Sequence, residues 1–90
     1  MHTTQSLYKS LVNHFDGCSD YALAPKLGIS KNTIYGWRGE RKIMSDDIAR
    51  KAAEILGYSE EEVLISLAAE RAKGTPAEQT WENIFNQVAA

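Results

Sequence analysis

Five polar side chains between residues 31 and 38 could form hydrogen bonds to a ligand whose edge presents a series of hydrogen-bond donors and acceptors. They are predicted to face solvent on one helix: Lys31, Asn32, Thr33, Tyr35 and Arg38. An asparagine amide pairs with adenine N6 and N7, a lysine ammonium donates to guanine O6 and N7, and a threonine methyl contacts a thymine methyl. Each good contact of this kind discriminates by ~1–3 kcal/mol. The chemistry predicted here is recognition of base edges.

Two other groups of side chains could do chemistry, and both have a structural interpretation. His14 and Cys18 are four residues apart, but no further cysteine or suitably placed histidine completes a zinc set. Glu60, Glu61 and Glu62 stand in the first turn of a predicted helix, where capping and the helix dipole explain them. No nucleophile elbow, phosphate loop or metalloprotease helix occurs. We therefore expect no enzyme activity, no metal and no cofactor.

The composition predicts one compact soluble domain. The chain has 90 residues, 43% apolar and 24% charged, and roughly 100–200 residues form one domain. No apolar stretch approaches the ~18 residues of a membrane span, and the first residues lack the layout of a secretion signal. A single cysteine agrees with a reducing compartment. We expect a cytoplasmic location and no membrane partner.

The charges are unevenly distributed along the chain. The net charge is −2, which taken alone argues against a nucleic-acid partner. Residues 26–51 carry seven Lys or Arg against three Asp or Glu, a net of +4, whereas residues 52–90 carry two against seven, a net of −5. A basic middle beside an acidic C-terminal part is typical of a DNA-binding face backed by a solvated or partner-facing region.

Six helices and no strand are predicted to position these residues, over roughly 4–16, 19–27, 30–38, 45–56, 59–73 and 76–89. Glycines able to take positive φ follow five of the segments: Gly17, Gly28, Gly39, Gly57 and Gly74. The candidate N-caps are Thr3 or Thr4, Ser19, Ser30, Ser45, Ser59 and Thr75. The segments 59–62 and 75–78 have the pattern of capping boxes.

Apolar residues at helical spacing predict the core. The inner faces are Leu7, Leu11 and Phe15 in the first helix, Ile48, Ala52, Ile55 and Leu56 in the fourth, and Val63, Leu64, Leu67 and Ala68 in the fifth. The second helix contributes Leu23, Ala24 and Leu27, and the third is anchored by Ile29, Ile34 and Trp37. With Gly28 in the turn between them, residues 20–39 have helix-turn-helix geometry, a pattern that any pair of packed helices can imitate.

The same stretch resembles the Cro and repressor type of helix-turn-helix regulators of phages and bacteria, and more narrowly small phage-associated regulators such as those of filamentous phages. The matching elements are SDYALAPKLGIS at 19–30, WRGER at 37–41, the alanine-rich helix 48–56, ERAK at 70–73, and Trp81. The resemblance covers about residues 7–88. Two positions depart from it. Pro25 lies in the body of a helix, and Gly36 stands where the family often has a polar base-reading side chain.

This resemblance implies an all-α, five- to six-helix bundle of the lambda-repressor-like type with a C-terminal amphipathic helix. Residues 1–58 would form the DNA-binding core, and residues 59–90 would complete the same domain and dimerise. The helix that starts at Ser30 would lie in the major groove, with base contacts from Lys31, Asn32, Thr33, Tyr35 and Gly36. Gly36 either lets this helix approach DNA closely or relieves packing against the preceding helix.

Phosphate contacts are expected on both sides of that helix. The predicted set is Ser19, Tyr21, Lys26, Ser30, Arg38, Arg41 and Lys42. Such contacts position a protein on DNA without reading its sequence. The start of the second helix suits a phosphate oxygen, although the carboxylate of Asp20 would compete with it.

The last helix carries an apolar stripe that must be covered. Trp81, Ile84, Phe85 and Val88 follow the spacing i, i+3, i+4, i+7. The stripe either folds back on Leu64 and Leu67 or pairs with its twin in a two-fold dimer, as needed to read two half-sites about one turn apart. The predicted dimer interface is Leu64, Leu67, Trp81, Ile84, Phe85 and Val88.

The sequence as a whole predicts a transcriptional regulator of the phage repressor or Cro-like kind. It would bind a palindromic double-stranded DNA operator as a homodimer, in the cytoplasm at the nucleoid. A protein antagonist could bind the acidic C-terminal half. The alternative from another class is a protein-interaction module, antitoxin-like or a phage adaptor, whose helix-turn-helix is structural.

Overall fold

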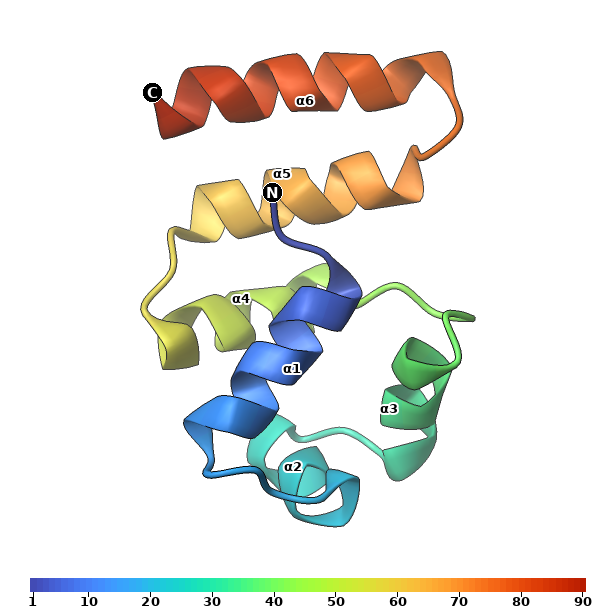
Figure 1. The fold of residues 1–90 in the computed structure, drawn as a ribbon, viewed down its shortest axis with the longest axis vertical. Helices are drawn as coiled ribbons and strands as arrows, with labels where there is room; N and C mark the ends of the chain where they lie inside the picture. Colours follow the sequence, from blue (N-terminus) through green and yellow to red (C-terminus); the bar gives the residue numbers. More distant parts are fainter.

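Six helices and no strand make up the computed structural model, which describes all 90 residues (Figure 1). The helices are α1 (Thr4–His14), α2 (Asp20–Leu27), α3 (Lys31–Arg38), α4 (Asp46–Leu56), α5 (Glu60–Arg71) and α6 (Pro76–Ala89). The all-α class and the order of the six segments are thus confirmed. None of the helices has the length and apolar character that crossing a bilayer requires.

Four helices begin at the serines predicted to cap them. The side chains of Ser19, Ser30, Ser45 and Ser59 each accept a backbone N–H from the first turn of α2, α3, α4 and α5. Helix α1 begins after Thr3, whose hydroxyl accepts from the Ser6 N–H while the Ser6 hydroxyl accepts from the Thr3 N–H. This reciprocal pair is a capping box that the sequence analysis did not predict.

The two predicted capping boxes are wrong. Ser59 accepts from the Glu62 N–H, but its hydroxyl also donates to Glu61, and no glutamate closes the box from the other side. The Thr75 side chain makes no cap hydrogen bond, and its hydroxyl donates to the carbonyl of Ala72 at the end of the preceding helix. Glu78 accepts from the Gly74 N–H and not from the Thr75 N–H, so neither half of this box forms.

The end of α3 also differs from the prediction. Gly39 caps α3 with φ −84, and the left-handed conformation falls on Glu40 with φ 58. A Cβ on Gly39 would meet the Arg41 guanidinium, which is the flexible end of an exposed side chain and can move away.

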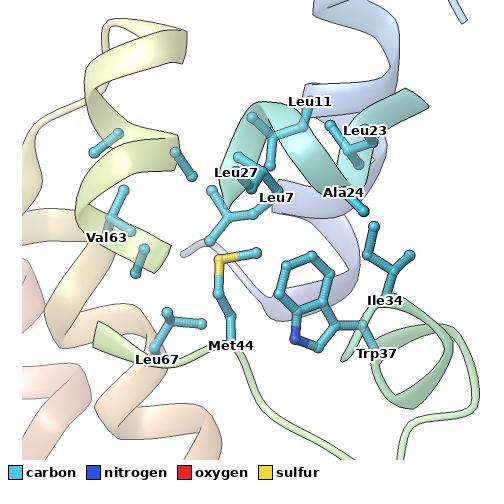
Figure 2. Packing of buried hydrophobic residues seen from close by; sticks show 13 residues of the cluster. Leu7, Leu11, Leu23, Ala24, Leu27, Ile34, Trp37, Met44, Val63 and Leu67 are labelled. Atoms are coloured by element: carbon cyan, nitrogen blue, oxygen red, sulfur yellow. The ribbon is translucent and has the colours of Figure 1, made fainter. Parts of the chain in front are cut away.

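The core is one cluster of 13 buried residues, to which the five helices from α1 to α5 all contribute (Figure 2). Helix α4 contributes Ala49, Ala52 and Ala53, whereas its larger Ile48, Ile55 and Leu56 are only half-buried. Small residues on the inner face let α4 approach α1 and α5 closely. Met44, from the loop after α3, is fully buried beside Trp37, a position that no helical periodicity could reveal.

A buried polar contact holds this loop against the ends of two helices. The Thr4 hydroxyl accepts from the Met44 N–H at 3.0 Å and donates to Glu70 at 3.0 Å. Arg71 donates to the Met44 carbonyl at 2.9 Å. Residues far apart in the chain therefore fix the backbone that follows α3.

Helix α6 lies alongside α5 at the edge of the molecule, on the side away from α2 and α3 (Figure 1). None of its residues is buried, whereas α5 places Val63 and Leu67 in the common core. Helix α6 therefore covers α5 without contributing to the core.

Candidate nucleic-acid interface

Helices α2 and α3 are joined by the tight turn that the sequence predicts. Gly28 ends α2 in the left-handed conformation with φ 68, and the Ile29 N–H donates to the Ala24 carbonyl at 3.0 Å. Ala24 is 3% exposed and lies in the buried cluster that also contains Ile34 and Trp37 of α3. Helix α2 runs through Pro25 without a break. Lys51 supports the turn from α4, because its ammonium donates to the Leu27 carbonyl at 3.2 Å.

One face of α3 is buried and the other is polar. Ile34 and Trp37 are buried, at 0% and 1% exposure. The polar face of α3 consists of Lys31, Asn32 and Tyr35, all exposed, and Thr33, half-buried. The Thr33 hydroxyl contacts that of Ser30 at 3.2 Å, whereas the Asn32 amide makes no hydrogen bond within the chain. An exposed, unengaged amide is available to a ligand.

Gly36 does not belong to this polar face. It is buried, and a Cβ built on it would lie 2.7 Å from Cδ and 2.8 Å from Cγ of Lys42. The side chain that needs the space thus comes from the loop after α3. Of the two predicted interpretations, close approach to DNA and packing against the preceding helix, neither describes this contact.

Four cations around α2 and α3 form no ion pair: Lys26, Lys31, Arg41 and Lys42. Lys26 lies 4.9 Å from the centroid of the Phe15 ring and Lys31 lies 4.8 Å from that of Tyr21. All four are exposed. By contrast, Arg50 and Arg71, on α4 and α5, are paired with Glu60 and Asp46. Four of the seven cations without an ion pair therefore lie on α2, α3 and the loop after α3, and the other three are Lys9, Lys51 and Lys73.

Arg38, predicted to contact a phosphate, is paired with Asp20, whose carboxylate was expected to compete with one. Arg38 Nη1 donates to Asp20 Oδ2 at 2.6 Å, and the Tyr8 hydroxyl donates to Asp20 Oδ1 at 2.5 Å. Burial and the hydrogen bond to Asp20 raise the pKa of Tyr8 to about 12, and the same carboxylate raises the pKa of Arg38. Tyr8 did not emerge from the sequence, where it stands on α1 with no pattern that links it to α2 or α3.

The raised pKa of Tyr8 predicts a late titration step. Because the folded pKa of about 12 lies above the ordinary value of 10.0, the contribution of Tyr8 to stability is complete below pH 10 and is lost as the pH rises from 10 to about 12. When tyrosinate absorbance is followed at alkaline pH, the step that belongs to Tyr8 should have its midpoint at about 12. The step should be absent from Tyr8→Phe. A titration curve that Tyr8→Phe leaves unchanged above pH 11 would contradict the assignment.

Most residues of the predicted dimer interface are accessible. Trp81, Ile84, Phe85 and Leu64 are half-buried, and Val88 is 43% exposed. Leu67 is the exception, since it is fully buried in the core of a single chain. It is therefore not available to a second copy and is removed from the interface. Trp81 lies with Leu64, Ile65 and Ala68 around a cleft between α5 and α6, so that part of the stripe packs within the chain.

The other candidate groups are placed as follows. No three His, Cys, Asp or Glu side chains come together in a way that could hold a metal ion. Glu60 pairs with Arg50, and Glu61 accepts from the Ser59 hydroxyl.

No protein-family model, curated protein or solved structure matches this chain. Its function is inferred from the side chains of α2, α3 and the loop that follows.

Proposed function

We propose that this chain is a sequence-specific double-stranded DNA-binding transcription regulator that inserts the polar face of α3 into the major groove. The observation that carries the proposal is the division of α3 into a buried apolar face and an exposed polar face, with four unpaired cations on α2, α3 and the loop after α3. The major groove of B-DNA, about 12 Å wide, admits one α-helix. A short helix held rigidly by a buried tryptophan suits that role.

Base contacts are assigned to Lys31, Asn32, Thr33 and Tyr35. Asn32 is suited to adenine, because its amide is exposed and forms no internal hydrogen bond. Lys31 would leave the ring of Tyr21, 4.8 Å away, to reach guanine. An exposed cation–π contact contributes about 0.5–1 kcal/mol, less than the ~1–3 kcal/mol of discrimination from a good base contact. Gly36 is not among the base-reading residues, because its surface is covered by Lys42.

Phosphate contacts are assigned to Lys26, Arg41 and Lys42, supported by the hydroxyls of Ser19, Tyr21 and Ser30. The three cations are exposed and form no ion pair. Each phosphate that a cation neutralises contributes about −0.9 to the slope of log affinity against log salt concentration. These phosphate contacts stabilise binding to DNA of any sequence, whereas the base contacts of α3 supply the preference for one sequence.

The regulator would act as a homodimer through Leu64, Trp81, Ile84, Phe85 and Val88. Two copies related by a two-fold axis can place their α3 helices in successive turns of the major groove. A dimer on a promoter would block polymerase, as in the repressor and Cro-like regulators of phages that the sequence resembles. The acidic part of the chain, residues 52–90, is a surface for a protein antagonist.

Selection from a randomised duplex library tests the proposal. Wild type should enrich an inverted repeat whose affinity falls steeply with salt. Asn32→Ala should lose the preference at one base pair of each half-site, by ~1–3 kcal/mol. Asn13→Ala makes the same change at an exposed position of α1, and this variant should select the wild-type repeat.

Two results of this selection would contradict the proposal. No enriched sequence in repeated selections, or the wild-type repeat from Asn32→Ala, would overturn the assignment of α3. Capture of a protein partner that Lys31→Ala, Asn32→Ala and Arg41→Ala all retain would favour the protein-interaction module.

Gly36→Ala should act through Lys42. An added methyl group would lie 2.7–3.2 Å from the Lys42 carbons and displace that side chain. We expect affinity to fall on all sequences alike, with the salt slope smaller by about 0.9 per half-site, as in Lys42→Ala. The double variant should bind like either single variant, since both remove the same contact. Anisotropy titrations over a range of salt concentrations measure this, and a change of preferred sequence would contradict it.

A further inference from the structure

One carboxylate joins the three helices of the DNA-binding region. Asp20 is the first residue of α2, Arg38 is the last residue of α3, and Tyr8 lies in α1. Both carboxylate oxygens are used, Oδ1 by the Tyr8 hydroxyl at 2.5 Å and Oδ2 by Arg38 at 2.6 Å. The Asp20 side chain is 11% exposed, whereas that of Arg38 is 57% exposed.

From this geometry we infer that Arg38 is a positioning residue, held by Asp20, and does not contact a DNA phosphate. The inference rests on the proposed function and revises one of its expected contacts. The Asp20–Arg38 pair sets the far end of α3 relative to α2, while the turn at Gly28 sets the near end. Sequence discrimination therefore depends on a pair of residues that touches no base.

The burial of Asp20 decides which partner Arg38 keeps. A carboxylate shielded from water is costly when it has no countercharge. If Arg38 moved to a phosphate, Asp20 would retain only the Tyr8 hydroxyl, and its negative charge would face the negative DNA backbone unneutralised. Lys42 and Arg41 have no such partner, so they can move to phosphates without exposing an acidic group.

The pair also restricts how α3 can turn. Ile34 and Trp37 anchor the middle of the helix in the core, but apolar contacts are not directional. A two-point contact at Asp20, with Arg38 on one oxygen and Tyr8 on the other, adds direction at the C-terminal end. Base contacts lose strength when their groups are displaced by fractions of an ångström, so loss of the pair should reduce discrimination more than overall affinity.

The test compares Arg38→Gln with two matched controls, on the selected operator duplex and on a scrambled duplex, across salt concentrations. Arg50→Gln removes one charge and one surface ion pair, Arg50–Glu60, between α4 and α5. Lys42→Gln removes a cation assigned to a phosphate. For Arg38→Gln we expect the ratio of operator to scrambled affinity to fall about tenfold. The Asp20 charge left unpaired also weakens binding to both duplexes, so the ratio, not the salt slope, distinguishes positioning from phosphate contact. Lys42→Gln should lower the slope by about 0.9 per half-site and keep the ratio, and Arg50→Gln should change neither.

Asp20→Asn provides the converse experiment. It keeps an oxygen for Tyr8 but releases Arg38, so affinity for the scrambled duplex should rise and the salt slope should increase by about 0.9 per half-site. Arg38→Lys retains a cation beside Asp20 and should recover most of the operator preference. Asp20→Asn serves as the test of the pair if Arg38→Gln is too unstable to measure.

The outcomes separate the inference from the proposed function. If Arg38→Gln lowers the salt slope as Lys42→Gln does, and the ratio of operator to scrambled affinity stays intact, then Arg38 is a phosphate contact. This result overturns the inference and leaves the proposed function standing. An unchanged scrambled-duplex affinity in Asp20→Asn overturns it as well. A wild-type chain that selects no duplex overturns the proposed function first.

Discussion

Val88→Glu is expected to convert the proposed dimer to a monomer and to weaken binding to the proposed operator strongly. Val88 is the most exposed member of the apolar stripe on α6, at 43%, and α6 has no buried residue. In a two-fold interface the new carboxylate occurs in both copies. An uncompensated buried charge costs about 3–5 kcal/mol, so the dimer dissociation constant should rise more than about a hundredfold.

Val88 is a sharper test than Trp81, because Trp81 also packs on Leu64 and Ala68 within the chain. Asn86→Glu adds the same charge at an exposed position of α6 outside the stripe and is the matched control. Sedimentation equilibrium measures the dissociation constant of the dimer. Comparing the affinity for a complete operator with the affinity for a single half-site measures how much the dimer contributes to DNA binding. A wild type that sediments as a monomer, or a Val88→Glu variant that remains a dimer, would contradict the assigned interface.

Trp37→Ala is expected to lower the free energy of unfolding by about 3–5 kcal/mol. Trp37 is the largest fully buried side chain, 1% exposed, and packs with Ile34, Met44 and Leu7 in the core (Figure 2). Its removal leaves a cavity where α3 meets the core. Because a domain of this kind is stable by about 5–15 kcal/mol in all, the variant would retain a small margin.

Urea denaturation followed by circular dichroism measures the loss. Tyr35→Ala removes an aromatic side chain from the exposed side of the same helix, where Tyr35 is 44% exposed. It should change the unfolding free energy by no more than about 0.5 kcal/mol. If the two variants unfold at the same urea concentration, α3 is not anchored by Trp37.

Local features of the fold were predictable from the sequence. The serines before α2, α3, α4 and α5 cap the helices as expected, and Gly28 makes the turn before α3. A cap, a turn and an apolar stripe each depend on residues within a few positions, so the chemistry of a short segment decides them. For the same reason the exposure of Lys31, Asn32 and Tyr35 follows from the positions of Ile34 and Trp37.

Features that depend on distant partners were decided only by the tertiary structure. Arg38 and Asp20 are 18 positions apart and Thr4 and Glu70 are 66 apart, so no local pattern indicates that they meet. A Cβ on Gly36 would meet the Lys42 side chain from the following loop, and Leu67 lies in the buried cluster that helices α1 to α5 share. The sequence by itself determined which segments are helical and which residues of α3 face outward. Packing decided which cations remain unpaired, because a charge is neutralised by whatever the fold brings within reach, at any separation along the chain.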